Sequence, residues 1–531
     1  MDLDAARRAI RDATFEPESD AVARLLQRDE RSNKLKRRVQ TQARRLIEDC
    51  RAHRDERSLL DAFLDQFGLS STEGVALMCL AESVLRVPDA ETVDALIADK
   101  LHGNQWQDHI GQSDSILVNA STWGLLLTGK VIDMGHDIQR DFGGWFNQLI
   151  NRMGEPIIRG SVQVAMQLLG SEFVYADTAE RALEKADPGQ LYSFDMLGEA
   201  ARTDADAQTY FDAYEHVLTL LAGFATGAPI EHALGISVKL SALHPRYESL
   251  KRDLVNEELY PKLQQLAGIA ARGGLQLTID AEEANRLDLT LGLFARLAAE
   301  PNLAHWQGLG LALQAYNKRA LPVLEWLRAV AEQTQRRLLV RLVKGAYWDT
   351  EIKHAQELGV SSYPVYTVKA ATDLSYLSCA QTLLAHPDQF FPQFATHNAN
   401  TLCNVMNLAQ GKAFELQRLH GMGELVYARA HALFKEMPSI RTYAPVGPHK
   451  HLLAYLIRRL LENGANSSFV NRFLDDATPV ADLTRDPAAK AAKTEPWIPL
   501  PADLYAPERS NARGYEIEEP VHLGELEREL S

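Results

Sequence analysis

Short β-rich runs alternate with helical patterns over about 280 residues of this chain, and this alternation constrains its fold more than any other feature. Helical stretches such as 205–222, 254–272 and 321–336 lie between runs rich in aliphatic and β-branched residues. The eight predicted strands are 192–197, 236–240, 275–279, 309–313, 338–343, 363–367, 390–395 and 414–419. Eight such units predict an α/β chain folded as a (β/α)8 barrel preceded by an all-α region.

The alternative arrangement of the same units is a doubly wound open sheet. A dinucleotide-binding sheet of that kind would carry GxGxxG after its first strand, and no such motif follows 192–197. The barrel is therefore the favoured architecture.

The remaining segments divide the chain into five parts. We expect a helical dimerisation-type arm at 1–57, a helical α-domain at 58–135, connecting helices at 136–190, the barrel at 191–475 and an extended tail or linker at 476–531. Residues 28–57 carry dense charge of both signs and few apolar residues. This pattern predicts a helix that projects from the body or crosses to a partner. Acidic residues flank the basic cluster 34–38, which favours a solvated helix face over a nucleic-acid contact.

Composition narrows the functional class. The 531 residues carry a net charge of −15, which argues against a general nucleic-acid binder. None of the four cysteines lies in a CxxC pair or near a His at metal spacing, so we expect a reducing compartment without disulfides. The N-terminus lacks a signal-peptide pattern, and no apolar run approaches the ~20 residues of a membrane span. These features predict a cytoplasmic protein that is at most peripheral at a membrane.

The run 338–348 sets two cations into an otherwise apolar strand. Arg341 and Lys344 precede a break at Gly345, where backbone can approach another group closely. A buried strand that ends in charge and a small residue is typical of a barrel strand facing a ligand. A structural ion pair is the alternative for both cations.

Polar residues follow every predicted strand, which predicts a large ligand with several hydrogen-bonding edges. The ends carry Asp195 and Glu199, Lys239, residues 280–283 and 314–316, Arg341 with Lys344 and Tyr347, Thr367, residues 396–398, and His420. His397 and His420 lack the HxH or HExxH spacing of metal ligands, so no metal is expected. A Schiff-base lysine at position 239 or 344 of an aldolase-like barrel remains the main rival enzyme class.

The apolar helix 454–464 adds a further candidate site. Tyr455 lies three and four residues before Arg458 and Arg459, so the three side chains share one face. Two guanidiniums and a phenol suit a small carboxylate on an apolar wall, and a surface ion pair is the alternative.

Several of these stretches match one family closely. Residues 192–200, 238–243, 278–283, 341–348, 394–398 and 455–466 resemble the proline dehydrogenase part of the bacterial bifunctional proline-utilisation flavoproteins (proline utilisation A). The match spans nearly the whole barrel. The region from about 58 to 135 also looks like that family's α-domain, and residues 1–57 look like its dimerisation arm.

The resemblance implies a distorted (β/α)8 barrel that binds FAD noncovalently. It implies oxidation of L-proline to Δ1-pyrroline-5-carboxylate by hydride transfer from C5 to flavin N5, the first step of proline catabolism to glutamate. Arg341 and Asp280 would be catalytic, and Glu199 would be a gate. The substrate would contact Lys239, Tyr347, Leu419, Tyr443, Tyr455, Arg458 and Arg459. The cofactor would contact Ala281, Gln314, Val343, Lys344, Gly345, Ala346, Tyr347, Trp348, Thr367, Thr396, His397, Asn398 and Glu462.

The expected partners follow from the same resemblance. Electrons would pass to a quinone, with peripheral contact at the inner membrane, and the arm suggests a dimer in the full-length protein. The family's ribbon-helix-helix DNA-binding domain and its NAD-dependent aldehyde dehydrogenase domain are expected to be absent, so no nucleic acid is expected as a partner. A non-enzymatic dimerisation or regulatory module is a third class, because the charged arm could carry the function alone.

Overall fold

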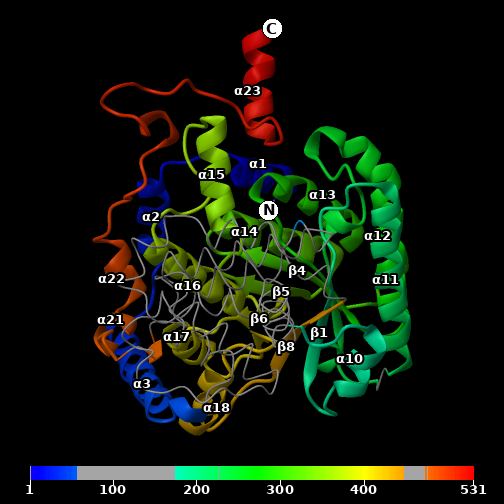
Figure 1. Cartoon of the computed structure of the whole chain (residues 1–531), viewed down its shortest axis with the longest axis vertical. Helices are drawn as coiled ribbons and strands as arrows, with labels where there is room; N and C mark the ends of the chain where they lie inside the picture. The colour runs from blue at the N-terminus through cyan, green and yellow to red at the C-terminus, as the bar shows by residue number, and fades with distance from the viewer. Residues whose placement is uncertain (1, 57–91, 93–173, 225–226, 448–472, 475) are drawn as a thin grey trace.

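Eight parallel strands close into a barrel at the centre of the molecule (Figure 1). The computed structural model describes residues 2–56, 92, 174–224, 227–447, 473–474 and 476–531. The strands are β1 (Leu191–Met196), β2 (Gly235–Val238), β3 (Gln276–Ile279), β4 (Leu309–Gln314), β5 (Leu338–Val343), β6 (Phe390–Ala395), β7 (Glu415–Leu419) and β8 (Ile440–Val446). Each strand pairs with the next along the chain, and β8 pairs with β1 from Leu191↔Arg441 to Met196↔Val446. This closure confirms the predicted fold class and excludes the open sheet.

One of the eight predicted strands is wrong. Residues 363–367 pair with the loop after β4 instead of with the barrel: the backbone N–H of Tyr366 donates to the carbonyl of Tyr316 at 2.8 Å, and Lys318 N–H donates to the Pro364 carbonyl at 3.1 Å. The strand that completes the barrel is β8, which contains Pro445. Proline lacks an N–H and cannot donate a hydrogen bond to a neighbouring strand, so a segment that contains it is not usually predicted as a central strand.

Helices cover the outside of the barrel because each strand needs both faces buried. They are α10 (Ala179–Lys185), α11 (Asp204–Gly223), α12 (Arg252–Arg272), α13 (Leu287–Ala298), α14 (Ala320–Thr334), α15 (Trp348–Leu358), α16 (Lys369–Ala385), α17 (Ala399–Ala409) and α18 (Glu424–Leu433). The helices α11, α12 and α14 correspond to the predicted stretches. A capping box between Thr203 and Asp206 fixes the start of α11.

The N-terminal helices lie against the barrel helices and do not project from them (Figure 1). They are α1 (Leu3–Asp12), α2 (Glu18–Gln27) and α3 (Asn33–Ala52). The few apolar residues of α3 fall on one face and pack on α17 and α18, with Ala43 and Ile47 fully buried. The expectation of a projecting helix is therefore wrong, because a narrow apolar stripe suffices to dock a helix whose other faces are charged. Its role in dimerisation stays a prediction.

The C-terminal segment runs along the outside of the barrel and returns to the N-terminal helices (Figure 1). It contains α21 (Val480–Leu483), α22 (Pro487–Ala491) and α23 (Pro520–Leu530). The helix α22 packs on α16. Further along, Glu519 forms a buried ion pair with Arg319 at 3.0 Å, and the ring of His522 stacks on Phe15 at 4.4 Å between centroids. These contacts fix the segment to the barrel body.

The buried ion pair between Arg441 and Glu415 connects the N-terminal ends of β8 and β7, and Arg441 also reaches β1. The Arg441 guanidinium donates to both oxygens of Glu415, at 2.8 and 3.1 Å. It also donates to the carbonyls of Tyr192, Ala233 and Glu231 at 2.7–3.1 Å. Both charged side chains are essentially inaccessible to solvent. One guanidinium therefore cross-links β8, β7, β1 and the approach to β2.

Three cysteines, Cys50, Cys379 and Cys403, are buried free thiols, and Cys79 lies outside the described residues. Within the described ranges, no helix combines the length and the apolar character that crossing a bilayer requires.

Candidate active site

Five side chains converge inside the C-terminal half of the barrel. Asp195 lies near the end of β1, Lys239 and Asp280 directly follow β2 and β3, Arg341 lies in β5, and Tyr443 lies in β8. Four of them lie in or directly after predicted strands, whereas Tyr443 lies in β8, which was not predicted, and parallel packing brings all five to one end of the barrel. The sequence predicted roles for four of them, and the structure brings those four together.

Arg341 is held by three different strands or strand ends. Its Nη1 donates to Asp280 Oδ1 at 2.7 Å, its Nε donates to Gln417 Oε1 at 2.8 Å and its Nη2 donates to Ser193 Oγ at 3.0 Å. The guanidinium also lies over the Tyr443 ring, 5.1 Å from its centroid. With every nitrogen engaged and the side chain buried, the charge of Arg341 occupies one fixed position.

Lys239 lies between two carboxylates. Its Nζ donates to Asp195 Oδ1 at 2.7 Å and lies 3.4 Å from both Asp280 Oδ2 and the hydroxyl of Tyr443. The Tyr443 hydroxyl in turn donates to Asp280 Oδ2 at 2.8 Å. Burial lowers the pKa of the Lys239 ammonium, but the carboxylates of Asp195 and Asp280 outweigh burial and raise that pKa well above its ordinary value.

This electrostatic setting weakens the Schiff-base alternative. A lysine must be neutral to attack a carbonyl, and Lys239 is held protonated. The other candidate, Lys344, pairs with Asp373 at 2.5 Å. Both lysines are thus placed as fixed positive charges.

The exits of β4 and β5 form a rim at the mouth of the barrel. The side chain of Gln314 donates to the Glu282 carbonyl at 2.7 Å and accepts from the backbone N–H of Ala346 at 3.3 Å. Gly345 lies in this rim with φ of 138°, and its backbone lies against the Tyr316 ring. The strand interior is buried, whereas residues 343–348 are half-buried or exposed. The rim is therefore accessible from outside the barrel.

Replacing Gly345 by Ala is expected to destabilise this rim. A Cβ at that position would lie 2.5 Å from the Tyr316 ring, on a backbone conformation that L residues rarely adopt. We expect a loss of about 1–3 kcal/mol in the free energy of unfolding. Gly292→Ala is the matched control, because a Cβ there meets nothing within 4 Å and the site lies inside the helix α13. Equal melting temperatures of the two variants would contradict the expectation.

The loop after β6 brings three more predicted residues near the mouth. Asn398 caps α17 by accepting from the Thr401 N–H at 3.0 Å, and the Thr396 hydroxyl accepts from the Asn398 N–H at 3.1 Å. His397 Nε2 accepts from the N–H of Leu419 at 3.0 Å, which joins the ends of β6 and β7. The loop is therefore shaped by its own hydrogen bonds.

Thr367 is held by an N-terminal helix. Its backbone N–H and its hydroxyl both donate to the carboxylate of Glu18 on α2, at 2.6–3.0 Å. The same segment borders the loop after β4, because the Tyr366 N–H donates to the Tyr316 carbonyl at 2.8 Å, so the cofactor role of Thr367 stays a prediction. Four other predicted site residues, Tyr455, Arg458, Arg459 and Glu462, lie outside the described residues.

The remaining predicted residues lie around the mouth. The described strand ends and loops carry Ala281, Glu199, Tyr347 and Trp348, all half-buried. The indole N–H of Trp348 donates to the Tyr366 carbonyl at 2.9 Å. Their roles stay predictions.

Sequence reasoning gave no role to three residues of the central network. Ser193 and Gln417 hold Arg341, and Asp195 holds Lys239. The sequence does carry a pattern that indicates such residues. Polar residues recur at every second position of strands that are otherwise buried, as at 193 and 195 of β1. Such positions point into a barrel, where a polar group requires a partner.

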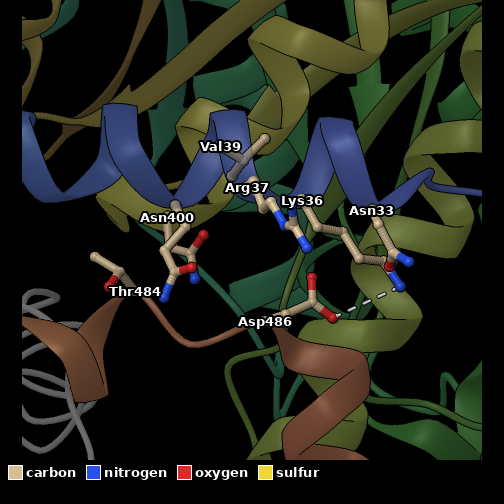
Figure 2. A pocket seen from close by; sticks show the side chains of 8 residues that line it. Asn33, Lys36, Arg37, Val39, Asn400, Thr484 and Asp486 are labelled. Carbon is tan, nitrogen blue, oxygen red and sulfur yellow. Dashed lines mark ion pairs between the residues drawn. The ribbon is translucent and has the colours of Figure 1, made fainter.

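A separate cavity of about 250 Å³ lies between α3, α17 and the C-terminal segment (Figure 2). The Lys36 ammonium lies 2.7 Å from Asp29 and 4.0 Å from Asp486 there. None of its lining residues belongs to the barrel network. Lys36 and Arg31 both pair with Asp29 and Asp486, so these charges are engaged with one another, as is typical of a packing seam.

Comparison with known proteins places these observations in one family. A family model described as proline dehydrogenase matches residues 178–472. The Bifunctional protein PutA of Klebsiella aerogenes is 46% identical over 99% of this chain and 42% of its own length. Proline dehydrogenase 1 of Bacillus subtilis is 26% identical over 56% of this chain and 88% of its own. A crystal structure of a Bradyrhizobium japonicum Proline Utilization A (PutA) mutant has a TM-score of 0.75 and 47% identity, covering 97% of this chain and 52% of that one. The chain thus spans about two fifths of the curated PutA sequence.

A second family model corrects one expectation. Residues 59–173 match a model described as the DNA-binding domain of proline dehydrogenase. The expectation that the chain lacks a DNA-binding domain and contacts no nucleic acid is therefore wrong. Net charge over a whole chain averages its segments, so −15 does not exclude one segment that binds nucleic acid. Apart from Thr92 these residues, and with them the predicted α-domain, lie outside the described part of the chain.

Proposed function

Because the chain belongs to the proline dehydrogenase family, we propose that its barrel oxidises L-proline to Δ1-pyrroline-5-carboxylate with FAD as the noncovalent cofactor. The single observation that carries the proposal is the fixed pair of cations in the barrel. Arg341 and Lys239 are both bound to Asp280, with nitrogen–oxygen distances of 2.7 and 3.4 Å. A redox site for a small zwitterion needs charges that neither move nor exchange protons during turnover.

In this proposal, Lys239 together with Arg458 and Arg459 binds the substrate carboxylate. A carboxylate clamped by fixed cations presents the ring in one orientation, and orientation alone lowers the barrier of a transfer between two bound partners. The ring of Tyr443, with Leu419, Tyr347 and Tyr455, would exclude water from the reacting carbon. Glu199 would close over the bound substrate by pairing with Arg458.

The residues at the mouth fit a flavin. A flavin ring needs a donor and an acceptor along its pyrimidine edge and a cation near the position where negative charge develops. The Gln314 amide already bonds Glu282 and Ala346, and its second N–H and second oxygen lone pair would serve the flavin edge, while Arg341 supplies a fixed cation. The accessible rim of Val343, Lys344, Gly345, Ala346 and Tyr347, with Thr396 and His397, would hold it. Bound FAD would supply hydride acceptance and electron transfer to a quinone, which no side chain here provides.

The protein's own part is then electrostatic. Arg341 keeps a positive charge beside the developing negative charge, and its three hydrogen bonds prevent it from swinging away. The quinone acceptor and peripheral contact with a membrane belong to the same proposal.

Replacing both Arg458 and Arg459 by Met tests the substrate assignment. Each charged hydrogen bond to a carboxylate is worth about 1.5–3 kcal/mol, so we expect the loss of two to raise KM for proline by at least about 100-fold. The assay follows proline-dependent reduction of a soluble quinone analogue and traps the imine product with an aromatic aminoaldehyde. The control is Arg485→Met, because Arg485 is exposed and pairs only with Asp482 among the described residues. An unchanged KM in the double variant would contradict the assignment of Arg458 and Arg459 to the substrate carboxylate.

Nucleic-acid binding is a second candidate function, favoured by the model that matches residues 59–173. A mobility-shift experiment with duplex DNA at two salt concentrations tests it, since phosphate contacts weaken as salt rises. Absence of any shift at low salt would remove this candidate.

A further inference from the structure

Asp195 is the most deeply buried acidic group of the site, and it has one unsatisfied oxygen. Its side chain is 1% exposed at the end of β1. Its Oδ1 accepts from Lys239 Nζ at 2.7 Å, whereas Oδ2 is buried without a hydrogen-bond partner in the described part of the chain. A buried carboxylate costs several kcal/mol unless a cation compensates it, so its retention here calls for a reason.

The two carboxylates of the site, Asp280 and Asp195, have different main partners. Asp280 divides its two oxygens between Arg341 and Tyr443, at 2.7 and 2.8 Å, and lies 3.4 Å from Lys239. Among the described residues, Asp195 forms its ion pair with Lys239. Asp280 is therefore the main partner of Arg341, and Asp195 is the carboxylate closer to Lys239.

We propose that Asp195 is a positioning residue that holds the Lys239 ammonium charged and aimed at the carboxylate of the substrate. This inference rests on the proposed function, because it acts through the carboxylate-binding role of Lys239. Asp195 itself would not touch the substrate.

Lys239 is faced by few other titratable groups. The Tyr443 hydroxyl approaches from β8, and the Tyr214 hydroxyl from α11 accepts from the Lys239 backbone N–H at 3.2 Å. Asp280 approaches from the end of β3, and it brings the positive charge of Arg341 with it. Removing the charge of Asp195 leaves Lys239 buried beside one shared anion. Burial then dominates, so the pKa of the ammonium falls.

The test compares Asp195→Asn with the wild-type holoenzyme. We expect KM for proline to rise about 10-fold while kcat stays within about 3-fold, as for the loss of one charged hydrogen bond. We also expect kcat/KM to fall at alkaline pH in the variant beyond any fall in the wild type, because the pKa of Lys239 falls when its nearest anion is removed. A residue with a merely structural role would not move this alkaline limb.

Two probes separate the carboxylate from the rest of the ring. Cyclopentanecarboxylate, which lacks the amine, is expected to inhibit the variant about 10-fold more weakly than the wild type. Pyrrolidine, which lacks the carboxylate, is expected to bind both equally. Asp288→Asn is the matched control, because Asp288 is an equally buried carboxylate paired with Arg7, Arg11 and Arg252 far from the barrel interior.

The outcomes are distinguishable. If the wild type does not oxidise proline, the proposed function fails first. If the wild type oxidises proline but Asp195→Asn keeps its KM and pH profile, the inference is overturned. If Asp195→Asn does not fold, Asp195→Glu in its place keeps the charge and is expected to keep cyclopentanecarboxylate affinity within about 3-fold, since Lys239 retains its anion. A Glu variant that folds and loses that affinity as fully as Lys239→Met would also overturn the inference.

Discussion

Replacing Arg341 by Met is expected to lower kcat/KM for L-proline about 1,000-fold, the upper range for removing one preorganised electrostatic group from an active site. The guanidinium is buried and bound to Asp280, Gln417 and Ser193, so no water replaces its charge at low cost. The variant also leaves Asp280 with Lys239 and Tyr443 as its remaining partners among the described residues. The measurement is steady-state turnover with a soluble quinone analogue, together with the flavin content of the purified variant.

Two further variants identify the cause of that loss. Arg341→Lys keeps a positive charge but loses the planar fork, so we expect intermediate activity. Arg337→Met removes a cation just before the start of β5, where Arg337 pairs with Glu231 at 2.7 Å, and is expected to keep kcat/KM within about 3-fold. An Arg341→Met enzyme with near wild-type turnover would contradict the electrostatic role.

Replacing Arg441 by Met is expected to cost about 3–5 kcal/mol of stability, the range for breaking a buried ion pair from one side. The guanidinium satisfies both oxygens of Glu415 and three backbone carbonyls at the closure of the barrel. Its loss leaves Glu415 as a buried anion with Gln417 Nε2, at 2.7 Å, as its remaining described partner. Denaturant unfolding followed by far-ultraviolet circular dichroism measures the difference.

The double variant Arg441→Met with Glu415→Gln distinguishes an uncompensated charge from lost packing. Since it buries no unpaired carboxylate, we expect it to be more stable than Arg441→Met alone. A double variant less stable than the single one would show instead that the backbone contacts of Arg441 dominate.

The barrel could be predicted because its strands are buried on both faces and read as short aliphatic runs between amphipathic helices. Aliphatic and aromatic runs alone do not identify every strand, since 363–367 was predicted as a strand and β8 was not. Tyr363, Val365 and Tyr366 have strand-forming side chains, yet their backbone pairs with a loop. In β8, by contrast, Arg441 and Tyr443 point inward to make ion pairs and hydrogen bonds, so the strand resembles a polar loop in the sequence.

The site was predictable where a charged residue directly follows a strand, as for Lys239 and Asp280, or interrupts an apolar strand, as for Arg341. Its supporting residues were harder to predict, because serine and glutamine are common at solvent-facing positions. The roles of Ser193 and Gln417 follow only from their hydrogen bonds to Arg341 across the barrel. Thr367 lies in the segment that was wrongly predicted as a barrel strand, and its hydroxyl donates to Glu18. Pairing across a closed sheet depends on register, which the local sequence does not specify.

The central claim is that this barrel holds a flavin which L-proline reduces. The most direct test is the visible absorption spectrum of the purified protein, recorded anaerobically before and after L-proline is added. The account predicts an oxidised flavin spectrum that bleaches with proline. A flavin that stays oxidised would contradict the substrate, and a protein that takes up no flavin even after incubation with FAD would contradict the cofactor and with it the proposed function.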